Sequence, residues 1–175
     1  MIASRFPKMR RTLPVGLCVQ AASEEDRETL AWMLTTCLTE LRAILGEAES
    51  SDPLSNYPWF DEYFSDPTRS PLLITEAGEV IGFALVRQLD RRVHQLAEFF
   101  ISQQHRRCGL GRSAATLVFG RFPGPWSVEY DSRNEPAARF WTGFTGARTP
   151  TKSESTDTSC RLALTFTAGS DGSLE

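Results

Sequence analysis

The spacing of apolar residues in the first part of the chain predicts a strand followed by a helix. Residues 13–22 form a strand-like run, and Ser23 with the acidic residues after it has the pattern of a helix N-cap and first turn. Apolar residues then recur at spacings of three and four until Gly46, which predicts a helix with one face in the core. That apolar face consists of Leu30, Met33, Leu34, Cys37, Leu38, Leu41 and Leu45.

The middle of the chain predicts a set of consecutive antiparallel strands. A polar loop at residues 47–55 and a short aromatic helix or turn at 57–64 come first. Three β-rich runs follow, separated by Ala77-Gly78-Glu79 and by Asp90-Arg91-Arg92, which are turn signals. These runs cover residues 72–76, 80–89 and 93–102. We therefore expect three neighbouring antiparallel strands at the centre of the fold.

Helical and strand patterns alternate in the rest of the chain. An apolar helical face ends at the turn Pro123-Gly124-Pro125. Asn134 and Pro136 mark the start of a later helix, because a proline in the first turn has no N–H that the helix needs. The predicted elements are a helix at 109–122, a strand at 126–130, a helix at 135–144 and a hairpin near 146–151 and 160–167. The fold class that follows is α+β.

Length and composition predict one independently folding domain. The chain has 175 residues, of which 41% are hydrophobic and 23% charged, so it can bury a core without disulfides or metals. We divide it into a flexible basic arm at 1–12, one domain at 13–167 and a loose tail at 168–175. No apolar run is long enough to span a membrane and no hydrophobic segment follows the basic N-terminus, so we expect a cytoplasmic protein without a membrane partner.

Composition also argues against several kinds of site. The four cysteines form no CxxC pair, and His94 and His105 are too far apart for an HExxH pair, so we expect no metal. The net charge of −3 offers no basic field, so we expect no nucleic-acid partner. The basic residues of the arm are more simply explained as solvated.

The stretch that carries chemistry runs from a predicted strand through a turn into a helix. Gly109 and Gly111 stand at the helix entry, where backbone N–H groups and the helix dipole favour an anion such as pyrophosphate. Arg106, Arg107 and Arg112 add positive charge beside them. The spacings that a Walker loop or a dinucleotide-binding fold requires are missing. We therefore predict a pyrophosphate-binding turn here.

This stretch resembles the R-x-x-G-x-G/A acyl-CoA signature of the GNAT superfamily of N-acetyltransferases. The signature is matched by Arg106, Gly109 and Gly111, and the N-x-x-A-x-x-Φ-Y segment of a later helix by Asn134, Ala137 and Phe140-Trp141. The order of the elements is similar over about residues 13–167. The resemblance implies a twisted, mostly antiparallel sheet of about six to seven strands, splayed between the fourth and fifth and flanked by about four helices.

The resemblance further implies acetyl-CoA as the cosubstrate and no metal. A backbone N–H at Phe100 or Ile101 would face the thioester carbonyl, and the turn before the helix would hold the pyrophosphate. The cofactor-binding residues implied are Phe100, Ile101, Arg106, Arg107, Cys108, Gly109, Leu110, Gly111, Arg112, Asn134, Ala137 and Trp141.

Transfer of an acetyl group to an amine requires a base, because the attacking amine must be neutral. By resemblance, Glu98 on the predicted strand before the turn is the candidate. The alternative is a solvated Glu98, or one paired with an arginine such as Arg87. Cys108 has no nearby base except His105, which we interpret as an exposed turn residue, so we expect direct transfer without a covalent acetyl-enzyme.

The sequence departs from the family pattern at Trp141. Many members have a tyrosine there that protonates the leaving thiolate, which an indole cannot do comparably. Tyr130 is the candidate replacement, although a tyrosine with a core role, with water as the proton donor, explains the sequence as well.

The resemblance places the acceptor site near residues 45–66. Tyr57, Trp59 and Asp61 are candidate substrate contacts, because carboxylates and ring faces suit a cationic amine. The alternative is an amphipathic helix with its acidic residues in water.

We predict transfer to a primary amine of a small molecule such as a metabolite, a polyamine or an antibiotic. The alternatives are an acetyltransferase acting on a lysine or the N-terminus of a protein or peptide, and an acyl-CoA-binding regulatory module without turnover. Since dimers are common among similar proteins, a homodimer is also compatible with the resemblance.

Overall fold

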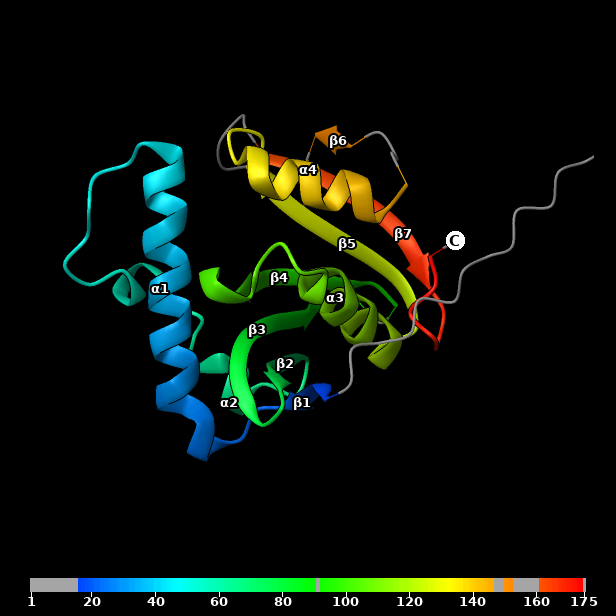
Figure 1. Cartoon of the computed structure of the whole chain (residues 1–175), viewed down its shortest axis with the longest axis horizontal. Coiled ribbons are helices and arrows are strands. Elements are labelled where there is room, and N and C mark those ends of the chain that lie inside the picture. Colours follow the sequence, from blue (N-terminus) through cyan, green and yellow to red (C-terminus); the bar gives the residue numbers. More distant parts are fainter. Residues whose placement is uncertain (1–15, 91, 147–149, 153–160, 175) are drawn as a thin grey trace, which may run out of the picture.

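A seven-stranded sheet forms the centre of the molecule (Figure 1). The computed structural model describes residues 16–90, 92–146, 150–152 and 161–174, so the predicted arm at 1–12 lies outside the described residues. The strand order is β1-β2-β3-β4-β5-β7-β6. The strands are β1 (Leu17–Ala21), β2 (Arg69–Glu76), β3 (Glu79–Gln88), β4 (His94–Ile101), β5 (Gly124–Asp131), β6 (Thr151–Lys152) and β7 (Arg161–Ala168). β4 and β5 pair in parallel and the other neighbours pair antiparallel, which confirms a mixed α+β fold.

Helices cover both faces of this sheet. Those of the described residues are α1 (Arg27–Leu45), α2 (Glu62–Ser65), α3 (Leu110–Arg121) and α4 (Glu135–Phe144). In Figure 1, α1 stands at one side of the molecule, and α4 lies along β5. No helix in the described part of the chain has the length and apolar character needed to cross a membrane.

Alternation along the strands separates two packing layers. One layer joins α1 and α2 to β3 residues such as Phe83 and Leu85. The other joins α3 and α4 to Ala84 and Val86, which are the intervening positions of the same strand. Since successive strand residues point to opposite faces, α1 and α2 cover one face and α3 and α4 the other.

The predicted helix ends are confirmed by their capping contacts. Gly46 ends α1 with a left-handed φ of 68°, a conformation that glycine adopts without strain. Asn134 caps α4, since its side chain accepts a hydrogen bond of 3.2 Å from the backbone N–H of Ala137. Pro136 lies in the first turn of α4, as expected.

Two segments differ from the predictions. Gly124 and Pro125 were expected in a turn, but they begin β5 and pair with Ala168 and Thr167 of β7. A proline is tolerated there because the start of a strand can spare an N–H.

The second difference concerns the tail that the sequence predicts to be loose. Ala168 forms a bridge to Leu174, and Leu174 packs against the core cluster that contains residues of α3 and α4. A Cβ added at Gly172 would lie 2.2 Å from the carbonyl oxygen of Thr116 on α3. The described part of the tail therefore folds back onto the domain, because it covers apolar surface there.

A close approach between β3 and β4 depends on Gly82, which pairs with Ile101. A Cβ at Gly82 would lie 2.2 Å from the carbonyl oxygen of Phe100, so Gly82→Ala is expected to force the strands apart. We predict a loss of about 1–3 kcal/mol in the free energy of unfolding, measured by urea denaturation. The control is Gly143→Ala on α4, where nothing lies within 4 Å of the added Cβ. Equal unfolding midpoints for Gly82→Ala and the wild type would contradict this packing.

Candidate functional site

The parallel strands β4 and β5 separate toward their C-terminal ends. Their pairing runs from His94↔Trp126 to Leu96↔Val128, although β4 continues to Ile101 and β5 to Asp131. Figure 1 shows the two strands diverging toward the side of the molecule where α1 stands. The main chain of β4 beyond Leu96 is therefore left without a β5 partner on that edge, which confirms the expected splay and makes a place for an extended ligand.

A β-bulge in β4 sets the direction of Glu98. Leu85 of β3 pairs with Glu98 while Val86 pairs with Leu96, so Ala97 is an extra residue in β4. Without the bulge, Glu98 would point to the same face as Leu96, because strand side chains alternate. With it, Glu98 shares the face of Leu85, which is the face covered by α1 and α2.

The turn after β4 ends at the start of α3, where several backbone amides have no hydrogen-bond partner among the described residues. Arg107 and Gly109 both have left-handed backbones, with φ of 65° and 87°. The first amide of α3 bonded to a carbonyl of the preceding turn is that of Ser113, which donates to Gly109 at 3.2 Å. The N–H groups of Leu110, Gly111 and Arg112 precede it, and no described residue accepts from them. Free amides at the positive end of a helix are suited to bind a phosphate.

Arg106 is engaged within the protein. Its Nε donates to the carbonyl oxygen of Ile101 at 2.6 Å, and its Nη2 lies 2.7 Å from Oε2 of Glu40. Its guanidinium also lies 5.2 Å from the ring centre of Phe100. Arg106 therefore ties the end of β4 to α1, whereas the sequence suggested a free charge beside a phosphate.

The other two arginines, Arg107 in the turn and Arg112 at the start of α3, differ from each other. Arg112 donates to the carbonyl of Gly143 at 3.0 Å and lies 4.9 Å from the ring centre of Phe144, so it covers the C-terminal end of α4. Arg107 is exposed, and no described residue binds its guanidinium. Arg107 is thus the arginine of this turn whose charge is free for an anionic ligand.

The carboxylate of Glu98 lies in a partly buried environment. Burial raises its pKa from 4.5 to about 7, against a smaller opposing effect of Arg161. No described residue forms a hydrogen bond or an ion pair with Glu98, and Arg161 pairs instead with Glu129. Arg87, the partner considered from the sequence, donates instead to Oε1 of Gln95. A carboxyl group with a pKa near neutrality has the protonation behaviour of a general base at physiological pH.

Tyr57 and Trp59 lie in the loop before α2. Their rings form an edge-to-face pair with centres 5.9 Å apart, and the Trp59 side chain is 49% exposed. Burial raises the pKa of Tyr57, and the charge of Glu98 raises it further, so Tyr57 faces the same region as Glu98. Among the described residues, Trp59 has no contact that connects it with Glu98.

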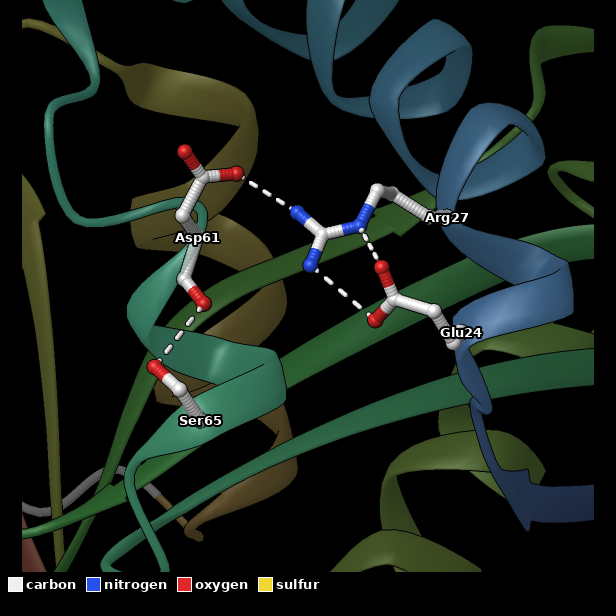
Figure 2. Close-up of polar contacts among 4 residues, drawn as sticks. All are labelled: Glu24, Arg27, Asp61 and Ser65. Carbon is white, nitrogen blue, oxygen red and sulfur yellow. Dashed lines mark hydrogen bonds and ion pairs between the residues drawn. The ribbon is translucent and has the colours of Figure 1, made fainter.

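Asp61 has a partner within the chain. Its Oδ1 lies 2.5 Å from Nη1 of Arg27, which also binds Glu24 (Figure 2). Ser65 donates to the carbonyl of Asp61 at 3.3 Å and so fixes the same turn. Asp61 therefore contributes to a contact between the start of α1 and α2. This contact joins residues 34 positions apart, and the sequence pattern does not reveal it.

The remaining predicted residues have mainly structural contacts. Trp141 and Tyr130 are only 5% and 6% exposed and belong to the core under α3 and α4. Ala137 packs against the same core, and Asn134 caps α4. Cys108 is exposed, and its thiol donates to the carbonyl of His105 at 3.2 Å.

One residue with a marked environment was missed from the sequence. Tyr63 of α2 is 2% exposed, and its hydroxyl oxygen has no hydrogen-bond partner among the described residues. Buried hydroxyl groups are normally bonded. The aromatic run at 57–64 gave no signal that separates Tyr63 from its neighbours, because its burial depends on packing against β2 and β3.

Comparison with protein families gives a match for most of the domain. Residues 29–144 match the family described as the acetyltransferase (GNAT) family. This segment begins within α1 and ends with α4, so it includes the splayed strands and the turn before α3. A comparison with curated protein sequences found no match.

Solved structures share this fold at low sequence identity. An acetyltransferase from Thermus thermophilus is 16% identical with a TM-score of 0.67, over 87% of this chain and 97% of that one. An acetyltransferase from Streptococcus agalactiae is 12% identical with a TM-score of 0.62, over 86% and 98%. A spermidine N-acetyltransferase from Vibrio cholerae, solved in complex with CoA and spermine, is 10% identical with a TM-score of 0.59, over 86% and 95%.

Proposed function

Because the chain belongs to the GNAT family of acetyltransferases, we propose that it transfers the acetyl group of acetyl-CoA to a primary amine of a small molecule. The observation that carries this proposal is the arrangement around the end of β4. The gap between β4 and β5, the Glu98 carboxylate and the free amides of α3 all belong to the segment that runs from β4 through the following turn to the start of α3.

The described residues fit acetyl-CoA at the turn after β4. Unbonded amides at the start of α3 would hold the pyrophosphate, with the free charge of Arg107 beside it. The open edge of β4 at Phe100 and Ile101 would donate a backbone N–H to the carbonyl of the acetyl group. Acetyl-CoA supplies the activated acetyl group as a thioester.

Arg106 and Arg112 would act indirectly in this site. Both already donate hydrogen bonds to protein carbonyls, at Ile101 and Gly143, so fewer of their N–H groups remain for a phosphate. In this proposal they hold the end of β4 and the end of α4 in place around the ligand. Asn134, Ala137 and Trp141 would form the wall of the gap on the α4 side, with Cys108 at its rim.

Glu98 would accept the proton of the amine, directly or through a water molecule. Its pKa of about 7 leaves a large ionised fraction at neutral pH, and the bulge at Ala97 turns it to the face of α1 and α2. The amine would therefore approach from that face, past Tyr57 and Trp59. Asp61 would shape this entrance through its contact with Arg27.

The leaving thiolate needs a proton from Tyr130 or from water. Tyr130 lies at 6% exposure near the end of β5, and a thiolate with a solution pKa of about 8.5 is a tolerable leaving group without an acid. Tyr130→Phe distinguishes these routes, because removing the hydroxyl lowers kcat only if it is the donor.

The test of the proposed function is thiol release from acetyl-CoA in the presence of free amines and lysine peptides. Spermine is included because the Vibrio cholerae neighbour was solved with it. We expect turnover with a free small-molecule amine. Turnover with peptides alone would identify a protein acetyltransferase instead, and CoA binding without turnover on any amine would identify a binding module.

A further inference from the structure

Arg87 is a partly buried cation for which the described residues provide no carboxylate. It lies near the end of β3, and its Nε donates to Oε1 of Gln95 on β4. Its terminal amino groups have no bonded partner in the described part of the chain. A partly buried charge without a counter-ion is unfavourable, so its retention suggests a ligand that neutralises it.

The neighbouring strand provides a direct comparison. Arg69 of β2 lies opposite Arg87 in the register, and like charges placed opposite each other destabilise a sheet. Arg69 is neutralised by Glu62 at 2.5 Å and by Asp66 at 3.6 Å. The chain therefore supplies carboxylates for one member of this pair and leaves the terminal groups of Arg87 free.

Arg87 lies on the face where the amine would approach. It is two residues from Leu85, which pairs with Glu98, so the positions differ by about 7 Å along the strand. Tyr57 is close enough to both charges for Glu98 to raise its pKa and for Arg87 to lower it, beside the larger effect of burial. The hydroxyl of Tyr57 thus lies within electrostatic reach of both groups.

An independent observation marks the same region as incomplete. The hydroxyl oxygen of Tyr63 is buried without a hydrogen-bond partner among the described residues. Burial raises the pKa of Tyr63, and the neighbouring hydroxyl of Tyr57 and the charge of Arg69 oppose that rise. The hydroxyl of Tyr57 lies next to that of Tyr63 and within electrostatic reach of Arg87. A polar group from outside the chain would complete the hydrogen bonds of these hydroxyls and neutralise Arg87.

We propose that Arg87, with the hydroxyls of Tyr57 and Tyr63, forms an oxyanion subsite of the acceptor-binding region. The acceptor is then an amine that also carries a carboxylate or a phosphate, as an amino acid does. Glu98 receives the amine, and Arg87 receives the anionic group through its free terminal amino groups. This inference rests on the proposed function and adds the class of acceptor to it.

Matched acceptors test the subsite. The pairs are lysine against 1,5-diaminopentane and phosphoethanolamine against ethanolamine, since the members of each pair differ in the anionic group. We expect kcat/KM to be about 10- to 100-fold higher for the anionic member of at least one pair, as a charged hydrogen bond would give. The pair with the larger ratio tells whether the group is a carboxylate or a phosphate.

Arg87→Gln should remove this preference. We expect the kcat/KM of the acceptor that carries the anionic group to fall by about 10- to 100-fold, mainly through KM, while that of the partner without this group changes by less than about 3-fold. Arg87→Lys should restore part of the preference, because it keeps the charge. Arg121→Gln, at the exposed C-terminal end of α3, is the matched control for loss of a positive charge.

Three results separate the outcomes. Equal use of both members of each pair by the wild type would overturn the subsite and leave the proposed function standing. An equal loss for both members in Arg87→Gln would show a structural role for Arg87 and also overturn it. Absence of transfer to every amine despite CoA binding would contradict the proposed function itself.

Discussion

Replacing Gly111 by glutamate is expected to weaken CoA binding by more than about 100-fold while the protein becomes at least as stable as the wild type. Gly111 is the second residue of α3, and an added Cβ would meet Phe140 at 3.5 Å and Ile101 at 3.8 Å, which are ordinary contacts. Glutamate favours a helix over glycine by up to about 1 kcal/mol, and a negative charge in the first turn adds about 0.3–1 kcal/mol. The same charge repels the phosphates that the free amides would hold.

Calorimetric titration with CoA measures the affinity, and thermal unfolding without ligand measures the stability. The control is Gly143→Glu on α4, which makes the same change at an exposed site with nothing within 4 Å of the added Cβ. That variant should bind CoA as the wild type does. If Gly111→Glu retained wild-type affinity, the start of α3 would not be the pyrophosphate site.

Glu98→Gln is expected to lower kcat/KM by about 10²- to 10⁴-fold, because a positioned general base contributes about that much. In the wild type, kcat/KM should rise with pH through an apparent pKa of about 7 as Glu98 ionises. The variant should lose this ascending limb and keep its affinity for CoA, since Glu98 faces α1 and α2 and the free amides are at the start of α3. An unchanged pH profile would show that another group is the base.

The stability of Glu98→Gln provides an independent test. Burial raises the pKa of Glu98 from 4.5 to about 7, so its ionisation favours the unfolded chain. This effect is absent below about pH 4, grows between pH 4.5 and 7, and is complete above that range. The glutamine variant has no charge to bury. The unfolding temperature of the variant minus that of the wild type should therefore be larger at pH 8 than at pH 4. A variant that gained nothing between these pH values would contradict the buried environment of Glu98.

Much of the fold could be predicted because local signals coincide with the elements. The apolar spacing and Gly46 define α1, and Asn134 with Pro136 defines the start of α4. The β-rich runs before residue 102 became β2, β3 and β4. These signals are local, since capping and side-chain period depend on residues a few positions apart.

The candidate site was less predictable because its geometry depends on contacts between distant segments. The side to which Glu98 points follows from the bulge at Ala97, and a bulge is a property of strand pairing. The bond between Arg106 and Glu40 spans 66 positions, so a free charge was the natural expectation from the motif alone. The sequence likewise gives no sign that the terminal amino groups of Arg87 lack a carboxylate, because this depends on the pairing of β3 with β2, where Arg69 binds the nearby carboxylates.

Amide NMR of the uniformly labelled protein during titration with CoA tests whether the backbone N–H groups of Leu110, Gly111 and Arg112 bind the pyrophosphate. We expect their amide signals, with that of Gly109, to shift most, and to stay in place when pantetheine, which lacks the phosphates, is added instead. Signals at the start of α3 that do not move with CoA would contradict the account.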